Sequence, residues 1–109
     1  MGHIETIAVI GAGQMGAGIA QVAAQAGYAV LLYDSFDDAV ERASAGIGKS
    51  LAKLESKGRL PEGETAASVQ MRIQPATSFE DMRHADFAIE AIIENEGIKK
   101  TIFKKLDEL

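Results

Sequence analysis

The feature that most constrains the fold of this chain is a glycine-rich turn between two apolar segments. Residues 6–10 form a short apolar, partly β-branched run, and the residues after it are Gly11, Ala12, Gly13, Gln14, Met15 and Gly16. Small and apolar residues then recur at three- and four-residue steps up to Ala26, and Gly27 follows them. This order predicts a buried parallel strand, a tight turn and a helix that ends at Gly27.

Each glycine of this turn has its own physical reason. Gly11 permits the tight turn from strand to helix, Gly13 lets a pyrophosphate approach the backbone, and Gly16 lets the helix pack close to the strand. Unpaired N–H groups and the helix dipole favour negative charge at the start of the helix. We therefore expect the backbone of residues 11–16 to bind the pyrophosphate of a dinucleotide. The alternative is a turn with a structural role alone.

An acidic residue stands where a dinucleotide site requires one. A second apolar run, residues 29–33, ends at Asp34, eighteen residues beyond Gly16. A carboxylate there can accept hydrogen bonds from both ribose hydroxyls of an adenosine, and it repels a 2′-phosphate. Strand, turn, helix and acid in this order favour NAD over NADP. FAD-binding domains have the same arrangement of glycine turn and acid, so these residues alone do not exclude FAD as the cofactor.

The pattern after Asp34 predicts a helical hairpin and two further strands. A helical apolar stripe runs from Asp37 to about residue 57, and a short helix around residues 64–71 completes the hairpin. Residues 73–76 form a weak strand, which Pro75 places at a sheet edge, and residues 87–93 form a strong one. Right-handed crossovers give the strand order 3-2-1-4, which is typical of a Rossmann-type, doubly wound parallel α/β sheet.

The end of the chain suggests an incomplete domain. Asn95 is expected to cap a last helix with Ile98, Ile102, Leu106 and Leu109 on one face, and the chain stops in that register. We expect residues 1–109 to be a truncated dinucleotide-binding domain, without the rest of the sheet and a helical C-terminal domain for catalysis and dimerisation. The fourth strand would then have an unpaired edge, through which the fragment should self-associate.

Composition excludes several other classes of function. The chain has no cysteine and a net charge of −5, which argue against thiolate chemistry, zinc–sulfur sites and nonspecific nucleic-acid binding. No apolar segment approaches the ~20 residues of a membrane span, and no secretory signal is visible, so we expect a cytoplasmic protein. The two histidines, His3 and His84, have the context of surface residues, and metal-ligand clusters are absent from the sequence.

Two further groups of polar residues have an open interpretation. Ser50, Lys53 and Lys57 share one helix face by their spacing, which suits either the phosphates and pantetheine arm of a CoA ester or a solvated surface, and spacing alone favours the surface. Glu94 follows the fourth strand, and Lys99 is five residues further on. These two could bind cofactor hydroxyls at the carboxyl edge of the sheet, or be a helix cap and an exposed lysine.

Three parts of the chain carry a resemblance to a known family: residues 9–20 (VIGAGQMGAGIA), Asp34 and residues 89–95 (IEAIIEN). Together they resemble the NAD-binding domain of 3-hydroxyacyl-CoA dehydrogenases. The resemblance extends over essentially the whole chain and disfavours a flavin. It implies that Glu94 and Lys99 contact NAD and that Ser50 and Lys57 contact CoA.

The resemblance also implies a reaction. Such enzymes oxidise an (S)-3-hydroxyacyl-CoA reversibly to the 3-oxoacyl-CoA with hydride transfer to NAD, as homodimers. Their catalytic histidine, in a His-Phe-x-Asn-Pro segment, and the glutamate that orients it have no counterpart up to Leu109. No catalytic residue is therefore assigned, and we expect this fragment alone to be inactive. The alternative is a stand-alone nucleotide-binding module without catalysis.

Overall fold

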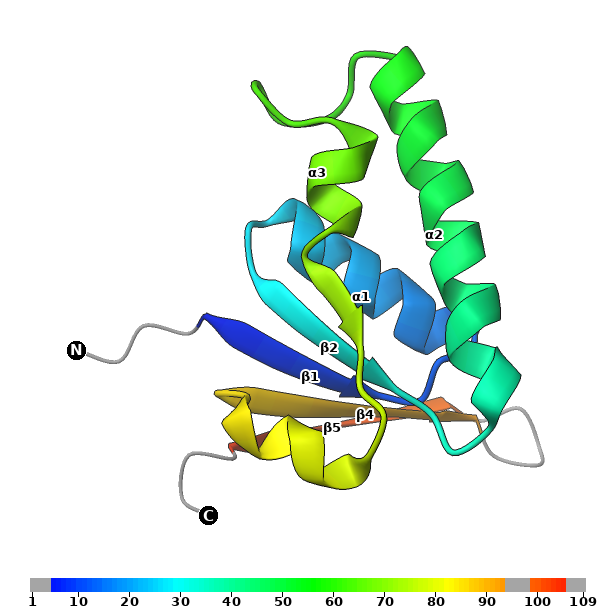
Figure 1. Ribbon diagram of the computed structural model, residues 1–109, viewed down its shortest axis with the longest axis vertical. Helices are drawn as coiled ribbons and strands as arrows, with labels where there is room; N and C mark the ends of the chain where they lie inside the picture. Colours follow the sequence, from blue (N-terminus) through cyan, green and yellow to red (C-terminus); the bar gives the residue numbers. More distant parts are fainter. Residues whose placement is uncertain (1–4, 94–98, 106–109) are drawn as a thin grey trace.

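The protein is one sheet with helices on both faces. A computed structural model describes residues 5–93 and 99–105, and Figure 1 shows α1, α2 and α3 above the sheet and the short 3₁₀ helix below it. The elements are β1 (Thr6–Ile10), α1 (Gln14–Gln25), β2 (Ala29–Tyr33), α2 (Asp37–Ser56), α3 (Ala66–Gln70), β3 (Ile73–Pro75), η1 (Phe79–His84), β4 (Phe87–Ile93) and β5 (Lys99–Lys105).

The strand order is β3-β2-β1-β4-β5. The first four strands are parallel, so the predicted order 3-2-1-4 and the Rossmann-type fold class are confirmed. The helical hairpin between β2 and β3 is also present, as α2 and α3. Pro75 lies in the edge strand β3, as expected for a residue that has no N–H for a strand partner.

The predicted last helix is wrong where the structure describes it. Residues 99–105 form β5, which pairs antiparallel with β4 from Phe87 opposite Lys105 to Ile93 opposite Lys99. Residues 94–98 and 106–109 lie outside the described residues. The outer edge of β4 offers unpaired N–H and C=O groups, and a segment with β-forming residues such as Thr101 and Ile102 can satisfy them. Because β5 pairs with this edge, the β4 edge is not unpaired, and the reason given for self-association of the fragment no longer holds.

Alternation along the strands divides the core between the two faces of the sheet. Val9 of β1 and Leu32 of β2 pack against α1, α2 and α3, whereas Ala8 and Ala88 pack against Met82 of η1. The apolar stripe predicted for the long helix is confirmed by its buried residues Ala43, Ile47 and Leu51.

The helix ends also follow from the sequence. The C-cap of α1 is Ala26, and Gly27 after it has φ +102°, a conformation that glycine adopts without steric cost. Thr65 and Ser68 form a reciprocal capping box at the start of α3. None of the helices in the described part of the chain is long and apolar enough to cross a membrane.

Candidate functional site

The glycine turn lies at the carboxyl ends of the parallel strands, where open α/β sheets bind ligands. Gly11 has φ +108°, and its N–H donates to the carbonyl oxygen of Tyr33 at 2.7 Å. A Cβ at Gly11 would lie 3.2 Å from the carbonyl carbon of Ala91 and closer still to its oxygen. The turn therefore passes between the ends of β2 and β4, with no space for a side chain at this position.

Gly13 and Gly16 place the start of α1 against this turn. Gly13 is the exposed N-cap of α1, and its carbonyl oxygen accepts from Ala17 N–H at 2.8 Å. A Cβ at Gly16 would lie 2.8 Å from the carbonyl carbon of Gly11 and 3.6 Å from Cγ1 of Val9. The helix thus approaches the turn itself more closely than the strand that the sequence indicated. The first backbone N–H groups of α1 have no partner within the helix, and no side chain caps them at Gly13.

Asp34 is held in place by two backbone groups. Its Oδ2 accepts from Ala12 N–H at 2.7 Å, and its Oδ1 accepts from Phe36 N–H at 2.9 Å. The carboxylate therefore joins the glycine turn to the start of α2. Because a carboxylate has about four acceptor sites, two remain for ligand hydroxyls. The sequence predicted a ribose acceptor at this position but gave no sign of the bond to the turn.

A cavity of about 730 Å³ lies between α1 and α2, and Asp34 is among the residues that line it. Of the predicted site residues, five line it: Ala12, Gly13, Gln14, Asp34 and Ser50. Met15 instead lines a second cavity, of about 610 Å³, beside α1. The structure thus brings the glycine turn, the acid and the hairpin serine to one concave surface.

The predicted stripe on α2 divides between this cavity and the solvent. The Ser50 hydroxyl accepts from Gln21 Nε2 at 3.0 Å, so it faces α1. Lys53 and Lys57 are exposed, and Lys57 is the C-cap of α2. Sequence reasoning missed Gln21, which no motif singles out.

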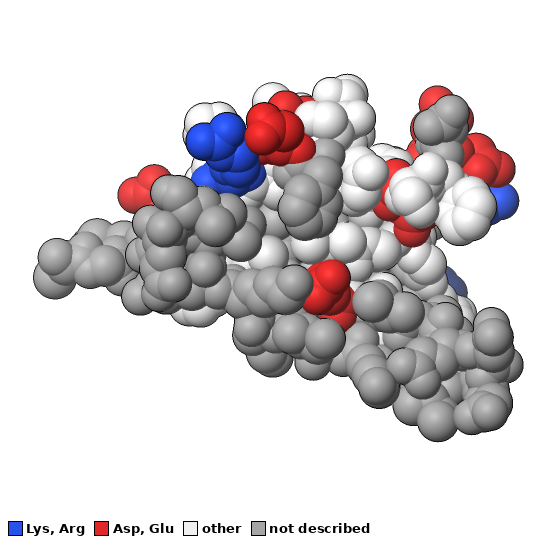
Figure 2. All heavy atoms as spheres, turned by 90° about the horizontal axis from the view of Figure 1, so that it is seen from below, with Lys and Arg blue, Asp and Glu red and all other residues white. Residues whose placement is uncertain are grey.

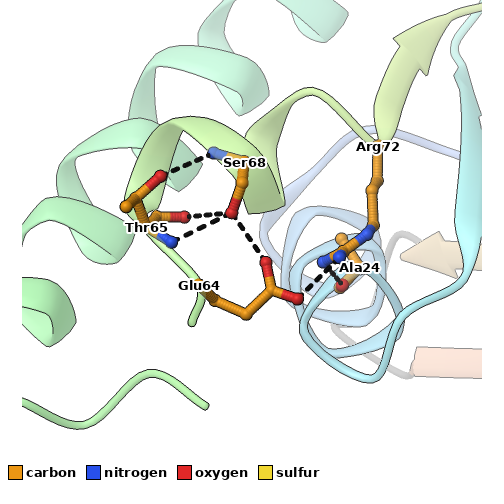
Figure 3. A network of polar contacts seen from close by, with 5 residues as sticks. All are labelled: Ala24, Glu64, Thr65, Ser68 and Arg72. Carbon is orange, nitrogen blue, oxygen red and sulfur yellow. Dashed lines mark hydrogen bonds and ion pairs between the residues drawn. The ribbon is translucent and has the colours of Figure 1, made fainter. Parts of the chain in front are cut away.

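A polar network holds the helical hairpin against the rest of the domain. Figure 3 shows Arg72, just before β3, donating to the carbonyl oxygen of Ala24 at 3.0 Å and to the Glu64 carboxylate at 2.7 Å. Ser68 Oγ donates to the other oxygen of Glu64 at 2.6 Å. Hydrogen bonds from Arg72 and Ser68 hold the pKa of the Glu64 carboxyl below its usual value. The network fixes α3 to the end of α1 and thereby positions the hairpin.

The other predicted site residues are placed differently. Glu94 lies outside the described residues, and Lys99 opens β5 instead of a helix. Glu90 is half-buried within β4, with Ile10 as its strand neighbour. His84 is exposed at the end of η1, just before β4 begins. It therefore lies at the amino ends of the parallel strands, whereas Asp34 lies at their carboxyl ends.

Polar groups at the site itself, and not a broad positive electrostatic field over the surface, must attract an anionic ligand. Figure 2 shows lysine and arginine side chains scattered singly over its face, with acidic ones between them, among the coloured residues. Within the described residues, no cluster of three or more His, Asp or Glu side chains could hold a metal ion. The cavity is therefore lined by the exposed backbone of Gly13, by the Asp34 carboxylate and by polar side chains that include Ser50 and Arg42, the last of which is paired with Asp38 at 3.1 Å.

Fold and site together define a dinucleotide-binding α/β domain. The exposed Gly13 backbone at the start of a helix suits a pyrophosphate, and the free acceptor sites of Asp34 suit ribose hydroxyls. A comparison with protein families then gives the particular family. The model of the 3-hydroxyacyl-CoA dehydrogenase NAD binding domain matches residues 6–109, so the chain belongs to this family, and its cofactor is NAD.

Individual relatives agree with this assignment. A probable 3-hydroxybutyryl-CoA dehydrogenase of Deinococcus radiodurans is 45% identical over 101 residues, which are 93% of this chain and 36% of that protein. The 3-hydroxyadipyl-CoA dehydrogenase of Escherichia coli K12 is 42% identical over 107 residues, 98% of this chain and 22% of that protein.

Solved structures give the same result. The crystal structure of (S)-3-hydroxybutyryl-CoA dehydrogenase from Ralstonia eutropha matches with a TM-score of 0.77 and 41% identity, over 85% of this chain and 32% of that one. The chain therefore spans about a third of the length of such relatives, or less.

Proposed function

We infer that this chain provides the NAD-binding part of an enzyme that oxidises an (S)-3-hydroxyacyl-CoA reversibly to the 3-oxoacyl-CoA. The observation that carries the inference is the pair of hydrogen bonds at Asp34, which fixes a carboxylate beside the glycine turn in a domain of this family. Relatives named 3-hydroxybutyryl-CoA and 3-hydroxyadipyl-CoA dehydrogenase support the substrate class.

Each part of the site has a proposed role toward NAD. The backbone of residues 11–16 binds the pyrophosphate, and Asp34 accepts from the adenosine ribose hydroxyls, where its charge repels the 2′-phosphate of NADP. Glu94 and Lys99 contact the cofactor from the end of β4. NAD, when bound, supplies the hydride acceptor.

The hairpin is the proposed binding element for CoA. Ser50 lines the same cavity as Asp34. Lys57 is exposed at the end of the same helix, where an ammonium group can meet a CoA phosphate without a large desolvation cost. The two residues are separated by two helical turns on one face of α2.

The 109 residues alone are proposed to bind NAD without turnover. His84 lies at the amino ends of the parallel strands and Asp34 at their carboxyl ends, so His84 cannot serve as general base at this site. Purified protein mixed with NAD and (S)-3-hydroxybutyryl-CoA should produce no NADH absorbance. A steady rise in absorbance would contradict this proposal.

The NAD site is tested by isothermal titration calorimetry of the 109-residue chain with NAD and NADP. We expect NAD to bind at least tenfold more tightly than NADP, because Asp34 repels the added phosphate. Asp34→Asn keeps one acceptor oxygen but removes the charge, and it should reduce this preference. Absence of NAD binding by the folded chain, or equal affinity for both cofactors, would refute the site. Circular dichroism of the variant checks that it is folded.

A further inference from the structure

Phe36 is a large, exposed apolar side chain that lines the α1–α2 cavity. It lines this cavity together with Asp34, and 71% of its surface is exposed. Its N–H donates to Oδ1 of Asp34 at 2.9 Å, two residues back along the chain. This short turn keeps the backbone of Phe36 beside the carboxylate that is proposed to bind the ribose.

Neither capping nor core packing explains an aromatic residue here. Phe36 is the N-cap of α2, a position that favours Ser, Thr, Asp or Asn, and it makes no side-chain capping bond. Most of the ring lies in solvent, so it adds little to the core. The side chain instead lines the same cavity as Asp34.

The cavity beside Phe36 has space for a flat ring. Its walls carry small residues, with Ala17 and Gly18 on α1 and Ala39, Ala43 and Gly46 on α2. A volume of about 730 Å³ is within the range of small-molecule sites. Gln21, Arg42 and Ser50 also line the cavity, and among its lining residues Phe36 is the one aromatic side chain on which a planar base can stack.

We propose that Phe36 packs its ring against the adenine of NAD and is the main residue that holds the base. The adenine is joined to the ribose whose hydroxyls are assigned to Asp34, so the base must lie near the residues that flank this acid. Aromatic side chains bind nucleobases by stacking. The inference rests on the proposed NAD site, and its test is chosen to fail separately from that site.

The test compares Phe36→Ala with the unchanged chain by calorimetry, with NAD and with ADP-ribose, which has the adenine but lacks the nicotinamide. We expect the Kd of both ligands to rise about tenfold. Phe36→Tyr retains the ring and should bind both ligands within about twofold of the unchanged chain. Met71→Ala is the matched control, because Met71 is also an exposed apolar residue (74%) but does not line the cavity, and its Kd values should be unchanged.

A second variant reports on the contact directly. The chain has no tryptophan, so Phe36→Trp introduces a single indole among the residues that line the cavity. Stacking on adenine should quench its emission as ADP-ribose is added, with a midpoint equal to the calorimetric Kd. An emission that stays constant while ADP-ribose binds would overturn the proposal.

The outcomes separate this inference from the proposed function. If the unchanged chain binds NAD but Phe36→Ala binds it equally well, the adenine contact is wrong and the NAD site stands. If Phe36→Ala weakens NAD but not ADP-ribose, Phe36 acts at the nicotinamide end, and the proposal is also overturned. If the folded, unchanged chain binds neither ligand, the NAD site itself is wrong.

Discussion

Two glycines of α1 allow a sharp test of how the turn is built. A Cβ at Gly16 would lie 2.8 Å from the Gly11 carbonyl carbon and closer still to its oxygen, whereas a Cβ at Gly18 would meet nothing within 4 Å. Both residues are in the same helix, two positions apart. Substitution by alanine therefore adds the same methyl group to the same element in two different surroundings.

The two variants should change stability in opposite directions. At Gly16 the obstacle is backbone, which no side-chain rotation can relieve, so we expect Gly16→Ala to lower the free energy of unfolding by about 3 kcal/mol, the upper range for overpacking. At Gly18 only the helix propensity changes, so Gly18→Ala should raise the free energy of unfolding by about 0.5–1 kcal/mol. These values correspond to a fall in Tm of about 12–24 °C and a rise of about 2–8 °C.

Thermal unfolding followed by circular dichroism measures both changes. Calorimetry with NAD below the transition should also show weaker binding by Gly16→Ala, because α1 must move away from the turn that is proposed to bind the pyrophosphate. Equal Tm values for the two variants would show that the close approach of α1 to Gly11 is not required. The explanation that Gly16 is needed for the close packing of α1 would then be wrong.

Three further outcomes are expected. Leu51→Ala should lower the free energy of unfolding by about 3 kcal/mol, measured by urea denaturation, because the Leu51 side chain of α2 is fully buried in the core. Arg72→Met should speed amide hydrogen exchange in α3 but not in β1, because Arg72 joins the hairpin to Ala24; equal effects in both elements would contradict this local role. The N–H groups of Glu5 and Thr6 lower the pKa of the Asp86 carboxyl, so this residue stabilises the fold above about pH 4, and the contribution is lost as the pH falls through the lower folded pKa. Asp86→Asn should thus reduce the difference in Tm between pH 7 and pH 3, and an unchanged difference would exclude the bond as its source.

Most of the fold could be predicted because its signals are local. Apolar runs that end in Gly11 and Asp34 indicate parallel strands, and the handedness of crossovers then gives the strand order. The edge position of β3 follows from Pro75. These features depend on residue type and chain order, both of which the sequence contains.

The strand β5 could not be predicted in the same way. The spacing of Ile98 and Ile102 is that of a helix face, whereas pairing with β4 depends on an edge that exists only in the assembled sheet. A local period cannot decide between a helix and a strand when a long-range partner stabilises one of them.

The candidate site was predicted in part. The turn and Asp34 followed from their order, but the bond from Ala12 to Asp34 depends on a side-chain conformation that no pattern contains. Gln21 was missed for the same reason, since its contact with Ser50 joins two helices. Phe36 carried a signal in the sequence, because an aromatic residue at a helix N-cap, two positions after the acid proposed to bind the ribose, is unusual.

The two bonds that hold Asp34 also limit how cofactor preference can change in evolution or by design. The carboxylate proposed to select NAD is also the acceptor for Ala12 N–H, so specificity and backbone geometry depend on one side chain. A basic residue introduced here to accept NADP would leave this N–H without its acceptor. A change of preference is therefore expected to need a compensating substitution nearby, and single replacements should lose NAD before they gain NADP. Conversely, the carboxylate is already oriented before the cofactor arrives, so binding need not order it.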